Sequence, residues 1–305
     1  MSSPLIVIAG GSGFIGRALA AEFSARGFAV VVLTRSPRPR KDGIREAAWD
    51  GAGTGAWTTQ LEHATAVINL AGKNINCRHT AENLREIAVS RVNSVAAIGA
   101  AMVQAKDPPR VWVQASAVGF YGDTGAVACN EGAPAGSDPL AEICRAWEAA
   151  FAAAKLAATR KLVLRIGFVL GREGGALPVL CQMTRMFLGG AAGSGRQYIS
   201  WIHLADLTAM FVAAVTDATL SGTFNAVGPN AVTNAEFMRE LRRELHRPWS
   251  PPAPALAVKF GARLLGSAGS LALVSQRCVP ERFLEAGFPF RYGELAKALQ
   301  DLCRP

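Results

Sequence analysis

The stretch LIVIAGGSGFIG at residues 5–16 decides the fold of this chain. Its first five residues are apolar and predict a buried strand, and the Ala-rich sequence at 17–23 behind the glycines predicts a helix. Gly10 permits a tight turn, Gly13 lets the backbone approach a pyrophosphate, and Gly16 lets the helix pack closely on the strand. The helix N-terminus favours an anion. The stretch therefore predicts a dinucleotide site, with an ordinary strand–turn–helix as the alternative.

The first half of the chain continues this alternation of strands and helices. Further apolar runs predict strands at residues 28–33, 44–49, 66–70, 110–115 and 161–166. Helical stretches separate these runs, the longest over about residues 80–104. Strands separated by helices imply right-handed crossovers and a parallel sheet covered on both faces. We therefore expect an α/β fold with a Rossmann-type doubly wound parallel sheet, built mainly from residues 1–170.

The pattern changes from about Gly171 onward. The sequence predicts helices at 177–188, 204–215 and 234–246, and short strands at 198–202 and 223–227. Four prolines between 248 and 254 precede a mostly helical segment over 248–305. We expect residues 171–305 to form a smaller, mostly helical C-terminal substrate lobe, with elements from about 197–228 returning to the nucleotide domain.

Composition and charge limit the function classes. Half of the 305 residues are apolar, but no run of about 18 uninterrupted apolar residues predicts a membrane span. The six cysteines and four histidines are scattered, which predicts reduced thiols in a cytoplasmic protein and no metal site. The net charge of +9 suits anionic ligands, but the dispersed basic residues and few aromatics do not predict nucleic-acid binding. The sequence leaves the oligomeric state open.

The end of the second predicted strand indicates which cofactor is bound. An NAD-preferring site has an acidic residue here, about 20 residues past the glycine loop, to bind the ribose 2′-hydroxyl. This chain has Thr34 and Arg35 instead, with Arg38, Arg40 and Lys41 close behind. Because an arginine at this point pairs with a 2′-phosphate, the sequence predicts NADP(H) rather than NAD(H). A solvated basic loop is the alternative.

The ends of the third and fourth predicted strands add further cofactor candidates. Asp50 follows the third strand and is a candidate for binding the adenine. The fourth strand leads into Leu70, Ala71 and Gly72, whose small size lets ribose and phosphates lie against the backbone. These residues extend the predicted site along the carboxyl edge of the sheet.

One charged residue interrupts an apolar helical stripe. The stripe has three- and four-residue spacing and consists of Leu84, Ala88, Arg91, Val95, Ile98 and Met102. A charge that faces a core needs a partner, which for Arg91 is either the bound cofactor or a strand-end carbonyl. The alternative is a packed stem whose head reaches water.

The sequence SAVGFYG at 116–122 makes a family resemblance specific. The chain resembles an atypical extended short-chain dehydrogenase/reductase of the NAD-dependent epimerase/dehydratase superfamily, in the "epimerase family protein" subfamily with its own C-terminal domain. This resemblance implies a Rossmann domain, bound NAD(P) and a substrate pocket under the C-terminal lobe. The matching stretches are GGSGFIG (10–16), LTRSP (33–37), INLAGKNI (68–75), SRV (90–92), SAVGFYG (116–122), LRIGFVLG (164–171), GSGRQYISWIHLADL (193–207), VTNAEF (232–237) and QRCVPERFLEAGFPFRY (276–292).

The chain departs from this family in its proton relay. Extended members use a serine or threonine, a tyrosine, and a lysine four residues later that lowers the pKa of the phenol. None of the three tyrosines here is followed by such a lysine. If Glu148 matches the glutamate that commonly follows that lysine, Leu140 stands at the tyrosine position and Cys144 at the lysine position. The resemblance therefore implies that the usual relay is absent.

Ser116 and Tyr121 remain as catalytic candidates. Ser116 is one residue away from the usual serine position; it either binds a substrate oxygen or bonds locally to the backbone. Tyr121, together with Lys73, His79 and Asp123, is a possible substitute acid or base, and each is otherwise a solvated loop residue.

Two residues near the start of the 204–215 helix are interpreted structurally. His203 and Asp206 form a helix-start cluster, because an aspartate in a first turn favours the helix dipole. We expect neither to take part in chemistry.

The predicted cofactor site groups the glycine loop with the carboxyl ends of the strands. Its residues are Gly10, Gly11, Ser12, Gly13, Phe14, Ile15, Gly16, Thr34, Arg35, Asp50, Leu70, Ala71, Gly72, Arg91, Ala115 and Gly167.

Two functions fit this site. One is an NADP(H)-dependent oxidoreductase or nucleotide-sugar epimerase-like enzyme that acts on a small molecule without the usual relay. The other is a non-catalytic NADP(H)-binding sensor or scaffold whose C-terminal segment contacts a partner. A pocket with polar groups that converge beside the nicotinamide favours the enzyme, and a plugged apolar one favours the sensor.

Overall fold

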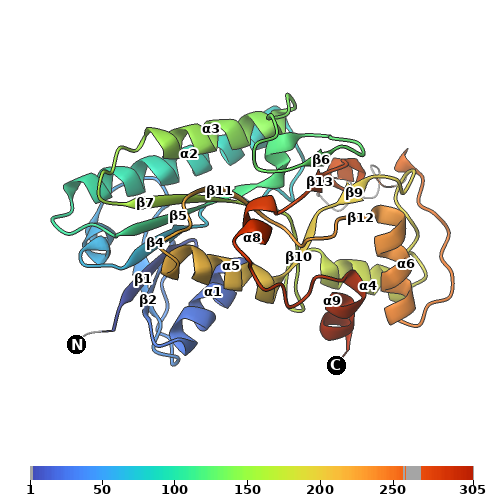
Figure 1. Cartoon of the computed structure of the whole chain (residues 1–305), viewed down its shortest axis with the longest axis horizontal. Coiled ribbons are helices and arrows are strands. Elements are labelled where there is room, and N and C mark those ends of the chain that lie inside the picture. The colour runs from blue at the N-terminus through green and yellow to red at the C-terminus, as the bar shows by residue number, and fades with distance from the viewer. Residues whose placement is uncertain (1–2, 257, 259–268, 305) are drawn as a thin grey trace.

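A seven-stranded parallel sheet forms the centre of the computed structural model, which describes residues 3–256, 258 and 269–304. The strand order across the sheet is β11-β7-β5-β4-β1-β2-β3 (Figure 1). The strands are β1 (Leu5–Ala9), β2 (Ala29–Thr34), β3 (Arg45–Ala48), β4 (Ala66–Asn69), β5 (Val111–Ala117), β7 (Arg160–Ile166) and β11 (Gly222–Ala226). Every neighbouring pair is parallel.

Helices cover both faces of this sheet, so the predicted doubly wound α/β fold is confirmed. Helices α1 (Phe14–Ala25) and α5 (Leu204–Thr216) lie on one face, and α2 (Ala81–Gln104) and α3 (Pro139–Ala153) lie on the other (Figure 1). Side chains of successive residues in a strand point to opposite faces of the sheet. Ile6 and Ile8 pack in the apolar core under α1 and α5, called the first core, and Val7 packs in the core under α2 and α3, called the second core.

The strand order reverses between β1 and β4. Strand β1 pairs with β2 on one side and with β4 on the other, and the chain adds its later strands outward from each. In open α/β sheets, ligands bind outside the carboxyl ends of the strands at such a reversal. The glycine loop after β1 lies at this point.

The second half of the chain builds a smaller, mostly helical region beyond β11. Its helices are α4 (Leu177–Arg185), α6 (Asn234–Glu244) and α9 (Leu295–Cys303), whereas α8 (Glu281–Glu285) returns to β11 and places Phe283 in the first core of the large sheet. Three two-stranded sheets join it to the loops: β8 (Phe168–Leu170) with β10 (Trp201–His203), β9 (Tyr198–Ile199) with β12 (Val232–Thr233), and β6 (Ala128–Cys129) with β13 (Arg277–Cys278). The 3-10 helices are η1 (Ala56–Leu61), η2 (Val118–Tyr121) and η3 (Gly269–Leu273). The smaller C-terminal region has an apolar core of its own, which contains Trp201, Phe237 and Leu299.

Several predicted boundaries in this region were wrong. The strand expected at 198–202 is two strands, because the Ser200 carbonyl accepts a hydrogen bond from Phe168 N and its hydroxyl bonds residues 276 and 278. The helices expected to reach 188 and 246 end earlier, where Phe187 and His246 take φ values of 62° and 53°. The segment expected to be mostly helical over 248–305 contains helices together with the two-residue strand β13, and its residues 257, 259–268 and 305 lie outside the described residues.

Helix α2 is long and apolar enough, by length and composition, to cross a membrane. Its residues Val95, Ile98 and Met102 are nevertheless buried in the core that the sheet shares with α3. A core helix of a globular domain passes the same test of length and composition, and the packing of α2 is that of a core helix.

The C-terminal helix α9 docks on the start of α5 through His203. His203 Nδ1 accepts the Ala205 N–H and so caps α5, with Asp206 in the first turn, as expected of a helix-start cluster. The imidazole stacks on the Tyr292 ring at 3.8 Å, and its Nε2 lies 3.3 Å from Asp301 of α9. The cap requires an unprotonated Nδ1, so it depends on a neutral histidine, whereas the contact with Asp301 does not.

We expect His203 to make the stability of the protein fall in mild acid. Burial lowers the pKa of His203 below its usual value and outweighs the opposite effect of Asp301. Because the folded pKa lies below the unfolded value of about 6.5, this stabilisation is present above pH of about 6.5 and is lost as the pH falls through the folded value. His203→Asn keeps a capping acceptor without the titration. It should reduce the loss of Tm between pH 7 and pH 5 by about 2–4 °C, since losing a helix N-cap costs about 1 kcal/mol.

Calorimetric unfolding across this pH range tests the expectation. The control is His246→Asn, because the His246 imidazole makes no hydrogen bond or ion pair with the described residues and asparagine tolerates its φ of 53°. Equal slopes in the wild type and His203→Asn would contradict a titrating cap.

Candidate functional site

Two glycines of the loop after β1 are required by the packing of the chain itself. Gly10 has φ of +76°, and a Cβ there would lie 2.9 Å from the Ala71 nitrogen. A Cβ on Gly16 would lie 2.4 Å from the Gly11 Cα. The loop therefore fits tightly between the ends of β1 and β4 and the first turn of α1.

Gly13 is different, because the protein does not need it to be glycine. The atom nearest to a Cβ built on Gly13 is the Gly10 carbonyl oxygen, at 3.5 Å, and the backbone is extended. Gly13 is exposed and is the N-cap of α1, which has neither a capping side chain nor an acidic residue in its first turn. This arrangement leaves room and free N–H groups for an anion. The residues present fit a dinucleotide pyrophosphate.

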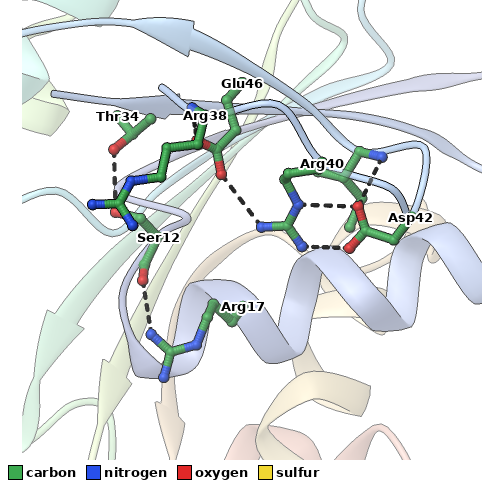
Figure 2. Close-up of polar contacts among 8 residues, drawn as sticks. Ser12, Arg17, Thr34, Arg38, Arg40, Asp42 and Glu46 are labelled. Carbon is green, nitrogen blue, oxygen red and sulfur yellow. Dashed lines mark hydrogen bonds and ion pairs between the residues drawn. The ribbon is translucent and has the colours of Figure 1, made fainter. Parts of the chain in front are cut away.

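Ser12 connects the glycine loop to the end of β2. Its hydroxyl accepts a hydrogen bond from Thr34 at 3.3 Å, and its carbonyl accepts one from Arg17 at 2.9 Å (Figure 2). Arg35, the next residue along the chain, is exposed and makes no hydrogen bond or ion pair with any residue that the structure describes. In Figure 2, the Arg38 side chain points toward the Ser12–Thr34 pair.

The basic cluster behind Arg35 is partly neutralised. Arg40 pairs with Asp42 at 2.5 Å and with Glu46 at 3.3 Å (Figure 2). The Arg40 guanidinium lowers the pKa of Asp42 to about 2. Glu46 also accepts the backbone N–H of Arg38. Among its arginines, the cluster therefore offers an anionic ligand the guanidinium groups of Arg35 and Arg38, while that of Arg40 is already paired.

Asp50 forms a local turn at the edge of this region. Its Oδ1 accepts the N–H groups of Ala52 and Gly53, both at 2.9 Å, and these bonds lower the pKa of Asp50. The side chain is exposed, and its second carboxylate oxygen makes no hydrogen bond to the described residues.

Arg91 of α2 reaches the end of β4 and brings a half-buried cation there. Its Nη1 donates to the carbonyls of Lys73 and Ile87, and the guanidinium lies 5.0 Å from the Trp147 ring centre. A Cβ on Gly72 would lie 3.1 Å from the Arg91 side chain. Burial lowers the pKa of Arg91. No carboxylate of the described residues pairs with it, and its Nε and Nη2 make no hydrogen bond to them.

Ser116, at the carboxyl end of β5, is hydrogen-bonded to a buried ionic network. Its hydroxyl donates to Glu148 Oε1 at 2.7 Å. Arg165 of β7 holds the same carboxylate with two bonds, Nε to Oε1 at 2.9 Å and Nη2 to Oε2 at 2.8 Å. The side chains of Arg165 and Glu148 are 6 % and 14 % exposed. The sequence reasoning used Glu148 only to place the missing relay and did not foresee this pair.

Tyr121 belongs to the same network. Its phenol donates to Asn225 Oδ1 at 2.7 Å and accepts from Arg165 Nη1 at 2.9 Å. Burial raises the pKa of Tyr121 to about 12, despite the nearby Arg165. A tyrosine relay of the family's kind requires the opposite effect, so the phenol here lies in an environment that opposes its ionisation.

The positions assigned to the missing relay hold no proton carrier. Leu140 has no titratable group, and burial raises the pKa of the Cys144 thiol to about 12. The loop candidates are bonded locally: Lys73 pairs with Glu86, His79 Nε2 contacts the Ile75 carbonyl, and Asp123 accepts the Gly125 N–H. Among residues 3–256, 258 and 269–304, no group of three or more His, Cys, Asp or Glu side chains is placed to hold a metal ion.

The remaining predicted residues have structural contacts. Ile15 packs on the first core and Ala115 in the second, while a Cβ on Gly167 would lie 2.3 Å from the Ser200 carbonyl oxygen. The Phe14 ring fits against three glycines of the loop that leads to α4, where added Cβ atoms would come within 2.4–3.2 Å of the ring: Gly171, Gly174 and Gly175. Phe14 thus joins the first turn of α1 to the C-terminal region.

Comparison with known families assigns both halves of the chain. Residues 6–228 match the NAD dependent epimerase/dehydratase family, and residues 253–302 match a domain of unknown function, DUF1731. The chain is 36 % identical to the chloroplastic SDR39U1 homolog of Arabidopsis thaliana, over 98 % of this chain and 86 % of that protein. It is 35 % identical to the epimerase family protein SDR39U1 of Bos taurus, over 97 % of this chain and 99 % of that protein.

Solved structures give the same result. The human epimerase family protein SDR39U1 (isoform 2) with NADPH matches with a TM-score of 0.86 and 31 % identity, over 98 % of both chains. A nucleoside-diphosphate sugar epimerase from Corynebacterium glutamicum matches with a TM-score of 0.77 and 32 % identity, over 99 % of this chain and 58 % of that chain.

Proposed function

The chain belongs to the NAD-dependent epimerase/dehydratase family, and we propose that it binds NADP(H) as an atypical short-chain dehydrogenase/reductase that acts on a small molecule. The observation that carries the proposal is Arg35. Its guanidinium has no described protein partner. Arg35 directly follows Thr34, which contacts Ser12 of the glycine loop, and it occupies the position where an NAD site has an acid. The human relative in complex with NADPH supports this choice of cofactor.

The proposed cofactor contacts follow the carboxyl edge of the sheet. The pyrophosphate lies against residues 10–16, with its charge on the free N–H groups of α1. The 2′-phosphate binds Arg35, assisted by the hydroxyls of Ser12 and Thr34. The free oxygen of Asp50 faces the adenine, and the edge of the site is completed by Leu70, Ala71, Ala115 and Gly167.

We propose that Arg91 contacts the cofactor beyond the pyrophosphate. Its Nη1 is used by two carbonyls, while Nε and Nη2 are free to donate to ribose or phosphate oxygens near Gly72. A half-buried guanidinium without a carboxylate partner is costly, and an anionic ligand offsets that cost. Bound NADP(H) supplies the hydride exchange, and the protein orients the reactants.

We propose Ser116 as the polar contact for substrate, with Tyr121 as a positioning residue. Because the Ser116 proton is donated to Glu148, its oxygen is left to accept a hydrogen bond from a substrate hydroxyl. The substrate, of a nucleotide-sugar-like class, would lie between the half formed by residues 1–170 and the lobe formed by 171–305. The name of the Corynebacterium relative supports this class. A cytoplasmic location stays a prediction.

The second candidate is a non-catalytic NADP(H) sensor. The high pKa of Tyr121 and the residues Leu140 and Cys144 favour it, because none of them moves a proton at neutral pH. If the protein catalyses oxidation of NADPH by any member of a panel of carbonyl compounds, it is an enzyme. Tight binding without turnover across the panel supports the sensor.

Calorimetric titration with NADPH, NADP⁺, NADH and NAD⁺ tests the cofactor proposal. A charge-assisted hydrogen bond contributes about 1.5–3 kcal/mol, so Arg35→Ala should weaken NADPH binding by about 10- to 100-fold and leave NADH binding unchanged. The matched control is Arg40→Ala, which removes the same charge from a guanidinium already paired with Asp42 and Glu46. It should change the affinity little.

Two outcomes would refute the proposal. Equal affinity of the wild type for NADH and NADPH would refute the assignment of Arg35. Absence of binding by all four nucleotides would refute the cofactor site itself.

A further inference from the structure

Two cysteines from distant parts of the chain meet in the C-terminal region. Cys181 of α4 and Cys303, the last residue of α9, place their sulfurs 3.6 Å apart although 122 residues separate them in sequence. Both are free thiols. Cys181 is buried and Cys303 is half-buried. The two sulfurs are therefore in contact, and one end of the pair is open to small reagents.

The surroundings favour a thiolate at Cys181 and a thiol at Cys303, because contact with Cys181 and burial raise the pKa of Cys303. A hydrogen bond from Cys303 lowers the pKa of Cys181, and the charge of Arg185, four residues further along α4, acts in the same direction. A thiolate rather than a thiol is the species that reacts with oxidants.

A second pair of neighbouring cysteines has surroundings that oppose ionisation of the thiols. Cys129 and Cys278 stand opposite each other in the β6–β13 pair, and both are buried. Burial raises the pKa of both thiols, that of Cys278 to about 12. This second pair is protected from oxidation by its apolar surroundings and serves as an internal reference.

We propose that Cys181 and Cys303 form an oxidation site that closes into an intramolecular disulfide on reaction with hydrogen peroxide. One sulfur of the pair, as thiolate, attacks a peroxide oxygen; the O–O bond breaks, and a sulfenic acid and hydroxide result, and the hydroxide takes back from solvent the proton released when the thiolate formed, which gives one water. The second sulfur attacks the first, forms the S–S bond and expels hydroxide, which takes up the remaining thiol proton as a second water. One peroxide is reduced by two electrons, and two thiols are oxidised.

The disulfide would tie the C-terminal helix to the segment that follows β8. Arg172 of this segment already donates to the Asp301 carbonyl of α9 at 2.6 Å, so the covalent bond adds to an existing contact. Closing so long a loop restricts the unfolded chain and stabilises the folded one. We expect oxidation to raise Tm by about 5 °C or more.

The experiment treats the native protein with stoichiometric hydrogen peroxide, blocks free thiols, and identifies cross-linked peptides by mass spectrometry. The expected result is one disulfide between Cys181 and Cys303, the rise in Tm, and reversal of both by dithiothreitol. Cys181→Ser and Cys303→Ser should each abolish the cross-link, and Cys129→Ser should retain it. Should the buried Cys181 variant fold poorly, Cys303→Ser at the end of α9 alone decides.

Three results would overturn the proposal. They are a cross-link that persists in Cys303→Ser, a disulfide between Cys129 and Cys278 in place of the expected one, and oxidation of Cys303 to sulfinic acid without any cross-link. A disulfide that leaves Tm unchanged would refute its stabilising role.

Discussion

Replacing Gly13 with valine should lower the affinity for NADPH by at least about 100-fold and leave the fold intact. The extended backbone of Gly13 suits a β-branched residue, and its Cβ would meet no protein atom closer than 3.5 Å. The added side chain instead occupies the space in front of the α1 N-terminus where the pyrophosphate is expected. Losing those contacts costs about 3 kcal/mol of binding or more.

Titration calorimetry gives the affinity, and thermal unfolding gives the stability of the same variant. Valine is a poorer N-cap than glycine, so the free energy of unfolding should fall by about 1 kcal/mol. Gly132→Val is the matched control, because the nearest atom to its Cβ, on Asn130, also lies 3.5 Å away. Unchanged NADPH binding by Gly13→Val would show that the cofactor does not approach this loop.

Replacing Glu148 with glutamine should destabilise the protein by about 3–5 kcal/mol, because it leaves the buried Arg165 guanidinium without its counter-charge. Burial alone lowers the pKa of Arg165, and the two hydrogen bonds and the charge of Glu148 outweigh it, so the net shift is upward. Arg165 also lies 3.5 Å from the Phe120 ring centre. The glutamine amide keeps one oxygen, which can still accept from Ser116, but it turns its NH2 group toward the remaining Arg165 donor.

Denaturant unfolding measures this loss, and a second variant keeps the interpretation falsifiable. Glu148→Leu combined with Arg165→Met removes both charges and should recover part of the stability. Glu142→Gln, in the exposed pair with Arg145 on the same helix, should cost at most about 1 kcal/mol. A small effect of Glu148→Gln would mean that water or another group compensates the guanidinium.

The nucleotide-binding half of the fold was predictable because its signals are local. Strand β1 was predicted with its observed bounds, and β2 within one residue at each end. Both predictions rest on the spacing of apolar residues and the positions of glycines, which can be recognised in a short stretch of sequence. The family and the NADPH-bound relative confirm the predicted class. The cofactor residues themselves stay predictions, since they need a bound nucleotide to be tested.

The Glu148–Arg165 pair was missed although the sequence carries a signal for it. Arg165 interrupts the apolar strand at 160–166, and a charge in a strand covered on both faces requires a partner. The sequence does not say which of the 23 acidic residues supplies it. That choice depends on how α3 lies over β5 and β7.

The division of the 198–202 strand was not predictable from local pattern. Ser200 is held by Phe168, Gln276 and Cys278, which are distant in sequence. Nothing in the strand itself indicates these contacts. The same holds for the two sulfurs of α4 and α9, which the sequence showed only as scattered cysteines.

The position of β11 at the edge of the sheet has a consequence for synthesis of the chain. Strand β11 is formed by residues 222–226, after α4 and α5, yet it covers the outer edge of β7. A chain growing from its N-terminus on the ribosome therefore exposes the open edge of β7 until residue 226 of 305 has emerged. Unpaired strand edges bind other chains. Nascent chains and truncated products that stop before residue 222 are thus the forms of this protein most prone to aggregate, and the ones that depend most on chaperones.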